Sequence, residues 1–178
     1  MRKAGRLMAR FSASFWANRE GQMTNFSIID ADETPYLYVE RSCARAPEEI
    51  GAAMSSAFGE VFGFMQAHGI TPAGAAISLY TSYAPDVMEF RAGFIIARDD
   101  MGKADGAVQA DVTPAGRAVH GTHKGSYAKL RESYGQMHGF VTTEGLTFIP
   151  PTWEVYLNDP STVPEDELVT ELYQAIKD

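Results

Sequence analysis

An internal repeat constrains the fold of this 178-residue chain more than any other feature of its sequence. The segment AFGEVFGFMQAHGIT, residues 57–71, aligns with SYGQMHGFVTTEGLT, residues 133–147, at an offset of 133 − 57 = 76. The identical pairs are Gly59/Gly135, Gly63/Gly139, Phe64/Phe140, Gly69/Gly145 and Thr71/Thr147. Self-similarity at a fixed offset is typical of a chain that uses one supersecondary unit more than once. We therefore predict two copies of one unit.

Each copy contains signals for one helix. In the first copy Pro47 suits the first helical turn, and apolar residues then recur at helical spacing up to Gly69, a left-handed cap. In the second copy Ser126 is a candidate N-cap, and Gly145 ends the apolar stripe. The helices are therefore expected at equivalent places in the two copies.

Extended segments surround both helices. One is expected before each helix and a pair after it, which makes each copy a β-α-β-β unit. The expected strands are 35–41, 75–82 and 87–97 in the first copy, and 116–123, 151–158 and 168–176 in the second. The predicted fold class is α+β: a tandem duplication of this unit, with an antiparallel sheet, both main helices on one face and a central pocket.

The repeat also predicts the domain organisation. Repeat one is expected over 24–97, a linker over 98–115 and repeat two over 116–178, all within one domain, 23–178. Residues 1–22 lie outside the repeat and are expected to form a basic, flexible extension, or to follow an upstream start codon, with Met23 as the natural beginning. A short surface or nucleic-acid anchor is the alternative.

Charge and composition exclude several classes of function. Residues 1–22 carry +4, so the formal net charge of −8 leaves −8 − 4 = −12 for the rest of the chain. Such an acidic body repels phosphate backbones, so we expect it not to bind nucleic acid directly. No run approaches the roughly 20 apolar residues of a membrane span. Cys43 is the only cysteine, which excludes an internal disulfide and favours a cytoplasmic location.

Glu154 is the residue most indicative of function. It lies within Trp153-Glu154-Val155-Tyr156-Leu157, where strand alternation places it on one face with Tyr156. The equivalent position in the first copy, 154 − 76 = 78, is a serine. A carboxylate in an aromatic and apolar strand is costly unless water, a partner or a ligand satisfies it. Two interpretations stay open: Glu154 forms the floor of an aromatic cleft, or it faces solvent on an exposed sheet face.

Aromatic residues in both copies are candidates to line that cleft. Their ring faces would supply cation–π contacts of about 0.5–2 kcal/mol each. The candidates are Tyr36, Tyr38, Tyr80, Tyr83, Phe90, Tyr127, Tyr134 and Tyr156. Together with Glu154 they predict a site for a small ligand that is cationic or donates hydrogen bonds. We expect no cofactor and no metal, because His120 and His123 point to opposite faces of a strand and no other ligands converge.

Three motifs resemble a known family, over about residues 24–177. They are EVYLNDP at 154–160, HKGSY at 123–127, in which Ser126 replaces the usual proline, and TELY at 170–173. These resemble the gyrase-inhibitor-like (GyrI-like) small-molecule-binding family, also called the AraC-type effector-binding domain. The resemblance implies two β-α-β-β modules around a central pocket, as in multidrug-responsive bacterial transcription activators, with a buried glutamate at Glu154.

The resemblance leaves three functions open. The first is a stand-alone domain that senses or sequesters a hydrophobic, cationic ligand. The second is hydrolysis of strained, electrophilic toxins, with Glu154 as general acid or base and Tyr127 or Tyr156 positioning the substrate. The third is a protein-interaction role, with DNA gyrase or a separate regulator as partner. The chain contains no helix-turn-helix segment, so we do not expect direct transcription activation, and haem would lack an axial ligand.

Overall fold

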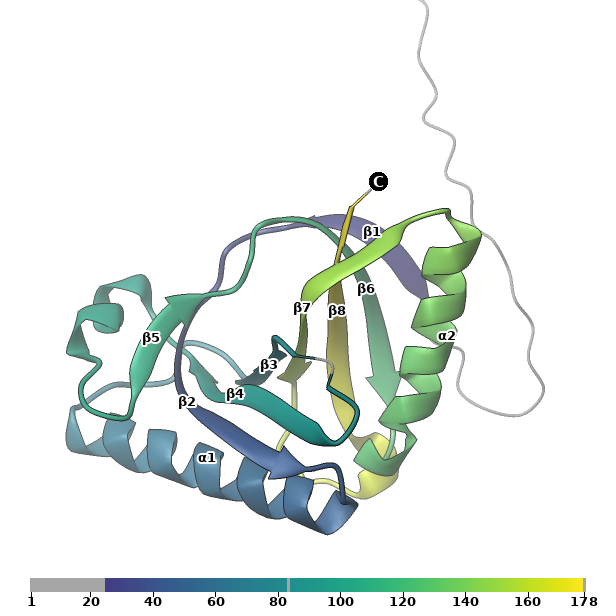
Figure 1. Ribbon diagram of the computed structural model, residues 1–178. Coiled ribbons are helices and arrows are strands. Elements are labelled where there is room, and N and C mark those ends of the chain that lie inside the picture. The colour runs from purple at the N-terminus through teal and green to yellow at the C-terminus, as the bar shows by residue number, and fades with distance from the viewer. Residues whose placement is uncertain (1–24, 83, 178) are drawn as a thin grey trace, which may run out of the picture.

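A computed structural model describes residues 25–82 and 84–177, which form one eight-stranded antiparallel sheet with two main helices (Figure 1). The elements in chain order are β1 (Phe26–Ala31), β2 (Pro35–Ala44), α1 (Pro47–Ala67), β3 (Ala76–Tyr80), β4 (Val87–Ile95), the 3-10 helix η1 (Arg98–Lys103), β5 (Gln109–Val112), β6 (Gly116–Lys124), η2 (Tyr127–Lys129), α2 (Leu130–Thr143), β7 (Thr147–Tyr156), η3 (Glu165–Glu167) and β8 (Val169–Lys177). The predicted α+β class is confirmed. The expected N-terminal extension lies outside the described residues.

The strands follow the order β1-β6-β8-β7-β3-β4-β2-β5. This order reads the same from either edge once β1 is exchanged for β5, β2 for β6, β3 for β7 and β4 for β8. The central pair, β3 and β7, takes one strand from each predicted repeat. At the two edges, β1 from the first predicted repeat pairs with β6 of the second, and β5 from the predicted linker pairs with β2 of the first. The two halves are therefore one sheet, while their origin by duplication stays an interpretation.

Two edge strands lie where no strand is predicted. β1 precedes the first predicted strand, and β5 falls inside the predicted linker, over 109–112. Both strands are short, and most of their side chains are partly or fully exposed. Neither sequence shows the clean apolar alternation that marks a half-buried strand. Their backbone partners, β6 and β2, come from distant parts of the chain.

The helix ends follow the predicted chemistry closely. Pro47 occupies the first turn of α1. Gly69 and Gly145 take the left-handed conformation, with φ of 63° and 69°, directly after the two helices. In each case the next residue closes the cap: the N–H of Ile70 donates to Met65 and that of Leu146 to Val141. α2 itself begins one turn later than predicted, because Ser126 caps the short helix η2 instead.

Both main helices lie on the same face of the sheet, which we call the helix face. α1 packs through Val61 against β2 and β4, and α2 packs through Met137 against Val119 of β6 and Leu172 of β8; these four side chains are fully buried. Figure 1 shows α1 beneath β2 and α2 beside β6, outside the curve of the sheet. None of the helices that the structure describes is long and apolar enough to span a membrane.

The opposite face, which we call the inner face, has an apolar cluster of its own, and neither of the two main helices described packs over it. It contains Tyr36, Tyr38, Ile77, Leu79 and Trp153, all nearly inaccessible to solvent. The segments joining β1 to β2 and β5 to β6 are tied together by Thr34 and Thr113, each of which donates its backbone N–H to an oxygen of the other at 2.9 Å. The curved sheet thus has two separately buried faces.

Candidate functional site

Glu154 lies in the middle of β7, at the junction of the two halves of the sheet. Its neighbour across the β3–β7 pair is Ser78, and its neighbour across β7–β8 is Leu172. The carboxylate points to the helix face, where only 4% of the residue remains exposed. The interpretation in which Glu154 faces solvent is therefore wrong.

Three tyrosine hydroxyls surround the carboxylate, and we call Tyr80, Tyr134 and Tyr156 the tyrosine cage. Tyr134 of α2 donates to Oε1 at 2.6 Å. Tyr156, two residues along β7, donates to Oε2 at 2.5 Å, and Tyr80 of β3 lies 3.4 Å from the same oxygen. Ser78 extends the network, with its Oγ 2.7 Å from the Tyr156 hydroxyl and 3.1 Å from that of Tyr80. Both halves of the protein therefore contribute donors.

Burial dominates the electrostatics of this network. It raises the pKa of Glu154, while the hydrogen bonds of the cage and the proximity of His123 act in the opposite direction. Burial and the neighbouring carboxylate also raise the pKa of Tyr80 and Tyr156. Glu154 forms no ion pair with any of the residues that the structure describes. The site is a buried acid held by neutral donors.

Aromatic rings from both helix regions contact Tyr156. Phe58 of α1 meets it edge-on at 5.9 Å between ring centroids, and Tyr127 of η2 meets it edge-on at 5.6 Å. Phe58 also contacts Phe94, which contacts Phe62, a residue that is 43% exposed. A row of rings therefore leads from the tyrosine cage to the surface.

The phenylalanines of this row are not among the residues predicted for the site. Phe58 and Phe62 lie four residues apart on α1, so they share one side of the helix. That spacing is visible in the sequence, but it looks the same as the spacing of a core-facing stripe. Only the position of α1 beside Tyr156 separates the two cases.

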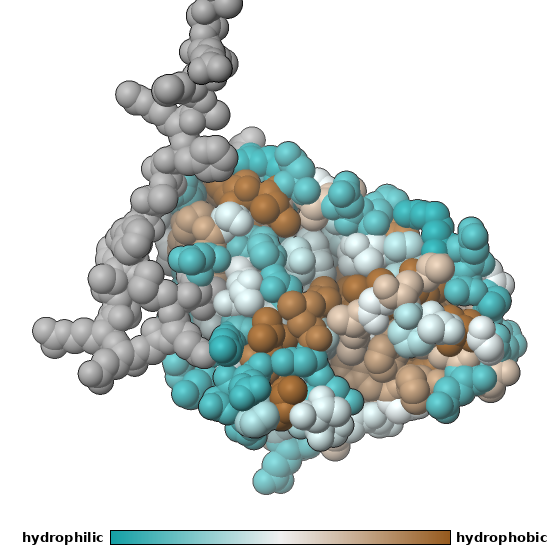
Figure 2. All heavy atoms as spheres, turned by 180° about the vertical axis from the view of Figure 1, so that it is seen from behind, coloured by the Kyte–Doolittle hydropathy of each residue, from teal (hydrophilic) through white to brown (hydrophobic). Residues whose placement is uncertain are grey.

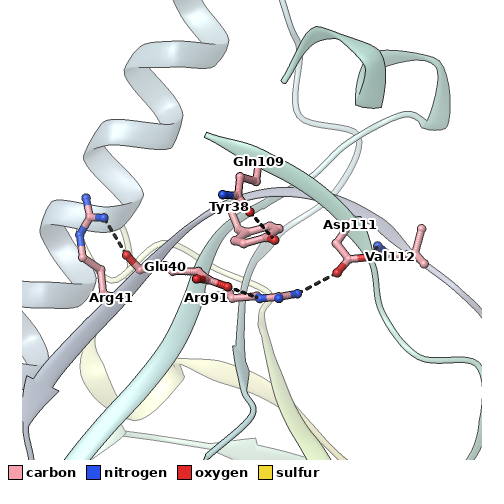
Figure 3. A network of polar contacts seen from close by, with 7 residues as sticks. All are labelled: Tyr38, Glu40, Arg41, Arg91, Gln109, Asp111 and Val112. Atoms are coloured by element: carbon pink, nitrogen blue, oxygen red, sulfur yellow. Dashed lines mark hydrogen bonds and ion pairs between the residues drawn. The ribbon is translucent and has the colours of Figure 1, made fainter. Parts of the chain in front are cut away.

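Tyr36 and Tyr38 do not belong with Glu154, and their prediction as neighbours in one cleft is wrong. Both point to the inner face, because the alternate residues of β2, such as Leu37, point to α1. The guanidinium of Arg91 lies 4.5 Å from the centre of the Tyr38 ring. The Tyr38 hydroxyl donates to Gln109 of β5 (Figure 3).

Arg91 organises this part of the inner face. It forms ion pairs with Glu40 at 3.1 Å and with Asp111 at 2.7 Å, which connects β4 to β2 and β5 (Figure 3). Burial raises the pKa of Tyr36 to about 12. The contacts around Arg91 explain how the short strand β5 is fixed to the sheet.

Phe90 and Tyr83 complete the predicted set. Phe90 is on the helix face but packs into the core beneath α1, with its ring 6.3 Å from that of Tyr80. It therefore supports the tyrosine cage without reaching the carboxylate. Tyr83 lies outside the described residues.

Two hollows, of about 350 and 340 Å³, lie away from the tyrosine cage. Residues such as Glu40, Glu89 and Arg91 line the first, and Trp153 and Val155 help to line the second. Glu154 lines neither of them. Because only 4% of Glu154 is exposed, a ligand reaches the carboxylate only if a neighbouring side chain moves.

One protein family matches almost the whole of the described chain. The profile of the GyrI-like small molecule binding domain matches residues 24–177. No curated protein matches the chain.

Solved structures share the fold. The C-terminal domain of EcmrR superposes with a TM-score of 0.69 at 21% identity, covering 88% of this chain and 99% of that one. In the EcmrR–DNA complex the corresponding values are 0.71, 21% and 86%, and the match spans 57% of the EcmrR chain. A hydrolase from Listeria innocua has a TM-score of 0.58 at 18% identity, with 85% and 91% covered.

One further structure contains a ligand. SAV2435 bound to tetraphenylphosphonium superposes with a TM-score of 0.58 at 9% identity, covering 85% of this chain and 93% of that one. At identities this low, the likeness to each of these structures shows the fold alone.

Proposed function

The chain belongs to the GyrI-like small molecule binding domain family, and from that premise we propose that it binds a hydrophobic cation whose positive charge lies against Glu154. One observation carries the proposal: a carboxylate that is 4% exposed and is held by three neutral hydroxyls. An ionised carboxylate is costly in such surroundings without an opposite charge. A bound cation supplies that charge.

The rings around Glu154 suit the apolar part of such a ligand. Phe58 and Tyr127 both contact the ring of Tyr156, one from each half of the protein. A cation placed among ring faces gains about 0.5–2 kcal/mol from each well-placed ring when water is excluded. The same rings present apolar edges to an aromatic or aliphatic substituent.

Binding requires the tyrosine cage to open. Tyr134 is the cage residue that comes from α2, and its hydroxyl covers Oε1 of the carboxylate. A cation that takes the place of this hydroxyl exchanges a hydrogen bond from a neutral donor for a charge–charge contact, which is the stronger interaction in a buried site. We propose that the protein senses or sequesters its ligand through this exchange.

The test compares binding of tetraphenylphosphonium by calorimetry in the wild type and in Glu154→Gln. Glutamine keeps the shape and removes the charge, so we expect affinity to fall about 10- to 100-fold, equivalent to roughly 1–3 kcal/mol. Glu144→Gln is the matched control, because Glu144 is exposed at the end of α2 and the change in net charge is the same. Equal affinity of Glu154→Gln and the wild type would refute the assignment.

Hydrolysis is the second candidate function, since burial raises the pKa of Glu154 as a general acid or base at neutral pH requires. The protein is incubated with an electrophilic, cyclopropane-bearing compound, and products are followed by mass spectrometry. A product formed by the wild type and not by Glu154→Gln supports hydrolysis. Absence of turnover by a protein that binds tetraphenylphosphonium refutes it for that substrate class. A gyrase or regulator partner stays a prediction.

A further inference from the structure

The hollow of about 340 Å³ lies on the inner face of the sheet, opposite the tyrosine cage. Its apolar lining includes Ile77 of β3, Ile95 of β4 and Val155 of β7. Trp153 and Tyr173 add aromatic surface. A hollow of this volume is at the lower end of the range in which small organic ligands are bound.

Strand β7 separates this hollow from the tyrosine cage. Trp153 and Val155 line the hollow, whereas Glu154 and Tyr156 belong to the cage on the helix face. Successive side chains of a strand point to opposite faces, so the backbone of β7 stands between the two places. A ligand in the hollow therefore makes no contact with the Glu154 carboxylate.

Two aromatic rings in the lining of the hollow are nearly parallel. The rings of Trp153 and Tyr173 stack with centroids 5.1 Å apart and planes inclined by only 2°. Trp153 lies opposite Leu79 across the β3–β7 pair, which fixes one side of the stack in the sheet. A planar aromatic molecule offers the shape and the π surface that such a wall recognises.

Charge at the hollow is one-sided. Among the described residues, its lining contains Asp30 and Asp32 and no lysine, arginine or histidine. Asp30 lies opposite Arg117 in the β1–β6 register, and Asp32, which also lines the hollow, is exposed. Thr34 and Thr113 bind each other beside it and hold the two connecting segments in place. The lining therefore repels anions and favours a cation.

We propose that this hollow is a second ligand site, which takes a flat aromatic amine in its protonated form. The rings of the ligand lie along the Trp153–Tyr173 wall and its positive nitrogen lies toward Asp32. The surface seen from behind Figure 1 shows apolar patches among hydrophilic side chains (Figure 2). This site is additional to the one at Glu154.

The probe for the test is proflavine, a planar cation of three fused rings, followed by fluorescence anisotropy with the full chain. The measurement uses Glu154→Gln, so that binding at the tyrosine cage is weakened in advance. We expect saturable binding to persist. Anthracene-9-carboxylate, which has three fused rings and the opposite charge, is expected to bind at least 10-fold more weakly.

Variants of the hollow identify the place of binding. Val155→Phe fills the hollow and is expected to lower the affinity for proflavine at least 10-fold. Val155→Ala enlarges the hollow, and its affinity is expected to stay within about threefold of that without the substitution. Asp32→Asn is expected to weaken binding about fivefold. If Val155→Phe does not fold, as judged by circular dichroism, Ala31→Leu serves the same purpose on an edge strand.

Two results would overturn this inference: proflavine binding that disappears in Glu154→Gln, or binding that survives the filling of the hollow in a folded variant. Tetraphenylphosphonium serves as the independent readout of the tyrosine cage, and Val155→Phe is expected to leave its affinity in the wild-type background unchanged. Failure of the second site and failure of the proposed function therefore give different patterns.

Discussion

Replacing Tyr134 with phenylalanine removes the hydroxyl that donates to Oε1 of Glu154 at 2.6 Å and keeps the ring. No other hydroxyl of the tyrosine cage reaches Oε1, since those of Tyr156 and Tyr80 approach Oε2. A hydrogen bond to an ionised acceptor contributes about 1.5–3 kcal/mol, and one between neutral groups about 1 kcal/mol. The variant should therefore lose about 2–3 kcal/mol of unfolding free energy when Glu154 is ionised and about 1 kcal/mol when it is protonated.

This difference makes the effect depend on pH. The pKa of Glu154 is raised in the folded protein, so its contribution to stability is fully present below the unfolded value near 4.5 and is lost as pH rises through the folded value. Tyr134→Phe removes a hydrogen bond that lowers this pKa, so the pKa of Glu154 rises further in the variant. The deficit of the variant should therefore grow as pH rises from 5 to 9.

Urea denaturation at pH 5, 7 and 9 measures the deficit, and a double-mutant cycle with Glu154→Gln isolates the pair. In the Glu154→Gln background, Tyr134→Phe is expected to cost about 1 kcal/mol at every pH. Tyr38→Phe is the control, because its hydroxyl donates to neutral Gln109 on the inner face. A deficit that is the same at all three pH values, or the same with and without Glu154, would refute the reasoning.

Two further predictions concern the sheet. Gly93→Ala would place a Cβ 1.8 Å from the carbonyl oxygen of Leu37, so we expect urea denaturation to show a loss of about 3 kcal/mol or more of unfolding free energy. In the control Gly59→Ala the new Cβ meets nothing within 4 Å, so the unfolding free energy should rise by about 0.5–1 kcal/mol. Similar losses in both variants would contradict the contact at Gly93. Arg91→Lys removes the guanidinium that binds both Glu40 and Asp111, so the unfolding free energy should fall by about 1 kcal/mol. Hydrogen exchange of the β5 amides should become faster in this variant. Unchanged exchange would count against the role of Arg91 in holding β5.

Local sequence signals predicted the helices and the principal strands. Pro47, Gly69 and Gly145 mark helix ends because their backbone preferences act within one turn, independently of the rest of the chain. β7 is less well predicted: it begins at Thr147, and its register with β8 shifts between Phe148 and Thr152, where prolines without N–H groups interrupt the ladder.

For the candidate site, too, local sequence patterns predicted only part of the arrangement. Alternation along β7 correctly placed Glu154 and Tyr156 on one face, and the resemblance of the motifs correctly indicated the family. The prediction that Tyr36 and Tyr38 lie near Glu154 is wrong, because both belong to the inner face. Alternation shows which residues of one strand share a face, but it does not show which face of a second strand lies on the same side of the sheet. That correspondence depends on the register of β2 with β4.

The sequence by itself determined the helix ends and the presence of one carboxylate among aromatic residues, because these depend on patterns a few residues long. Only the tertiary structure decided that Glu154 is buried and that Tyr134 and Tyr80 share it, since these donors are 20 and 74 positions away along the chain. The burial of a side chain depends on which other parts of the chain pack against it. Here those parts are α2 and β3, which come next to β7 only in the folded protein.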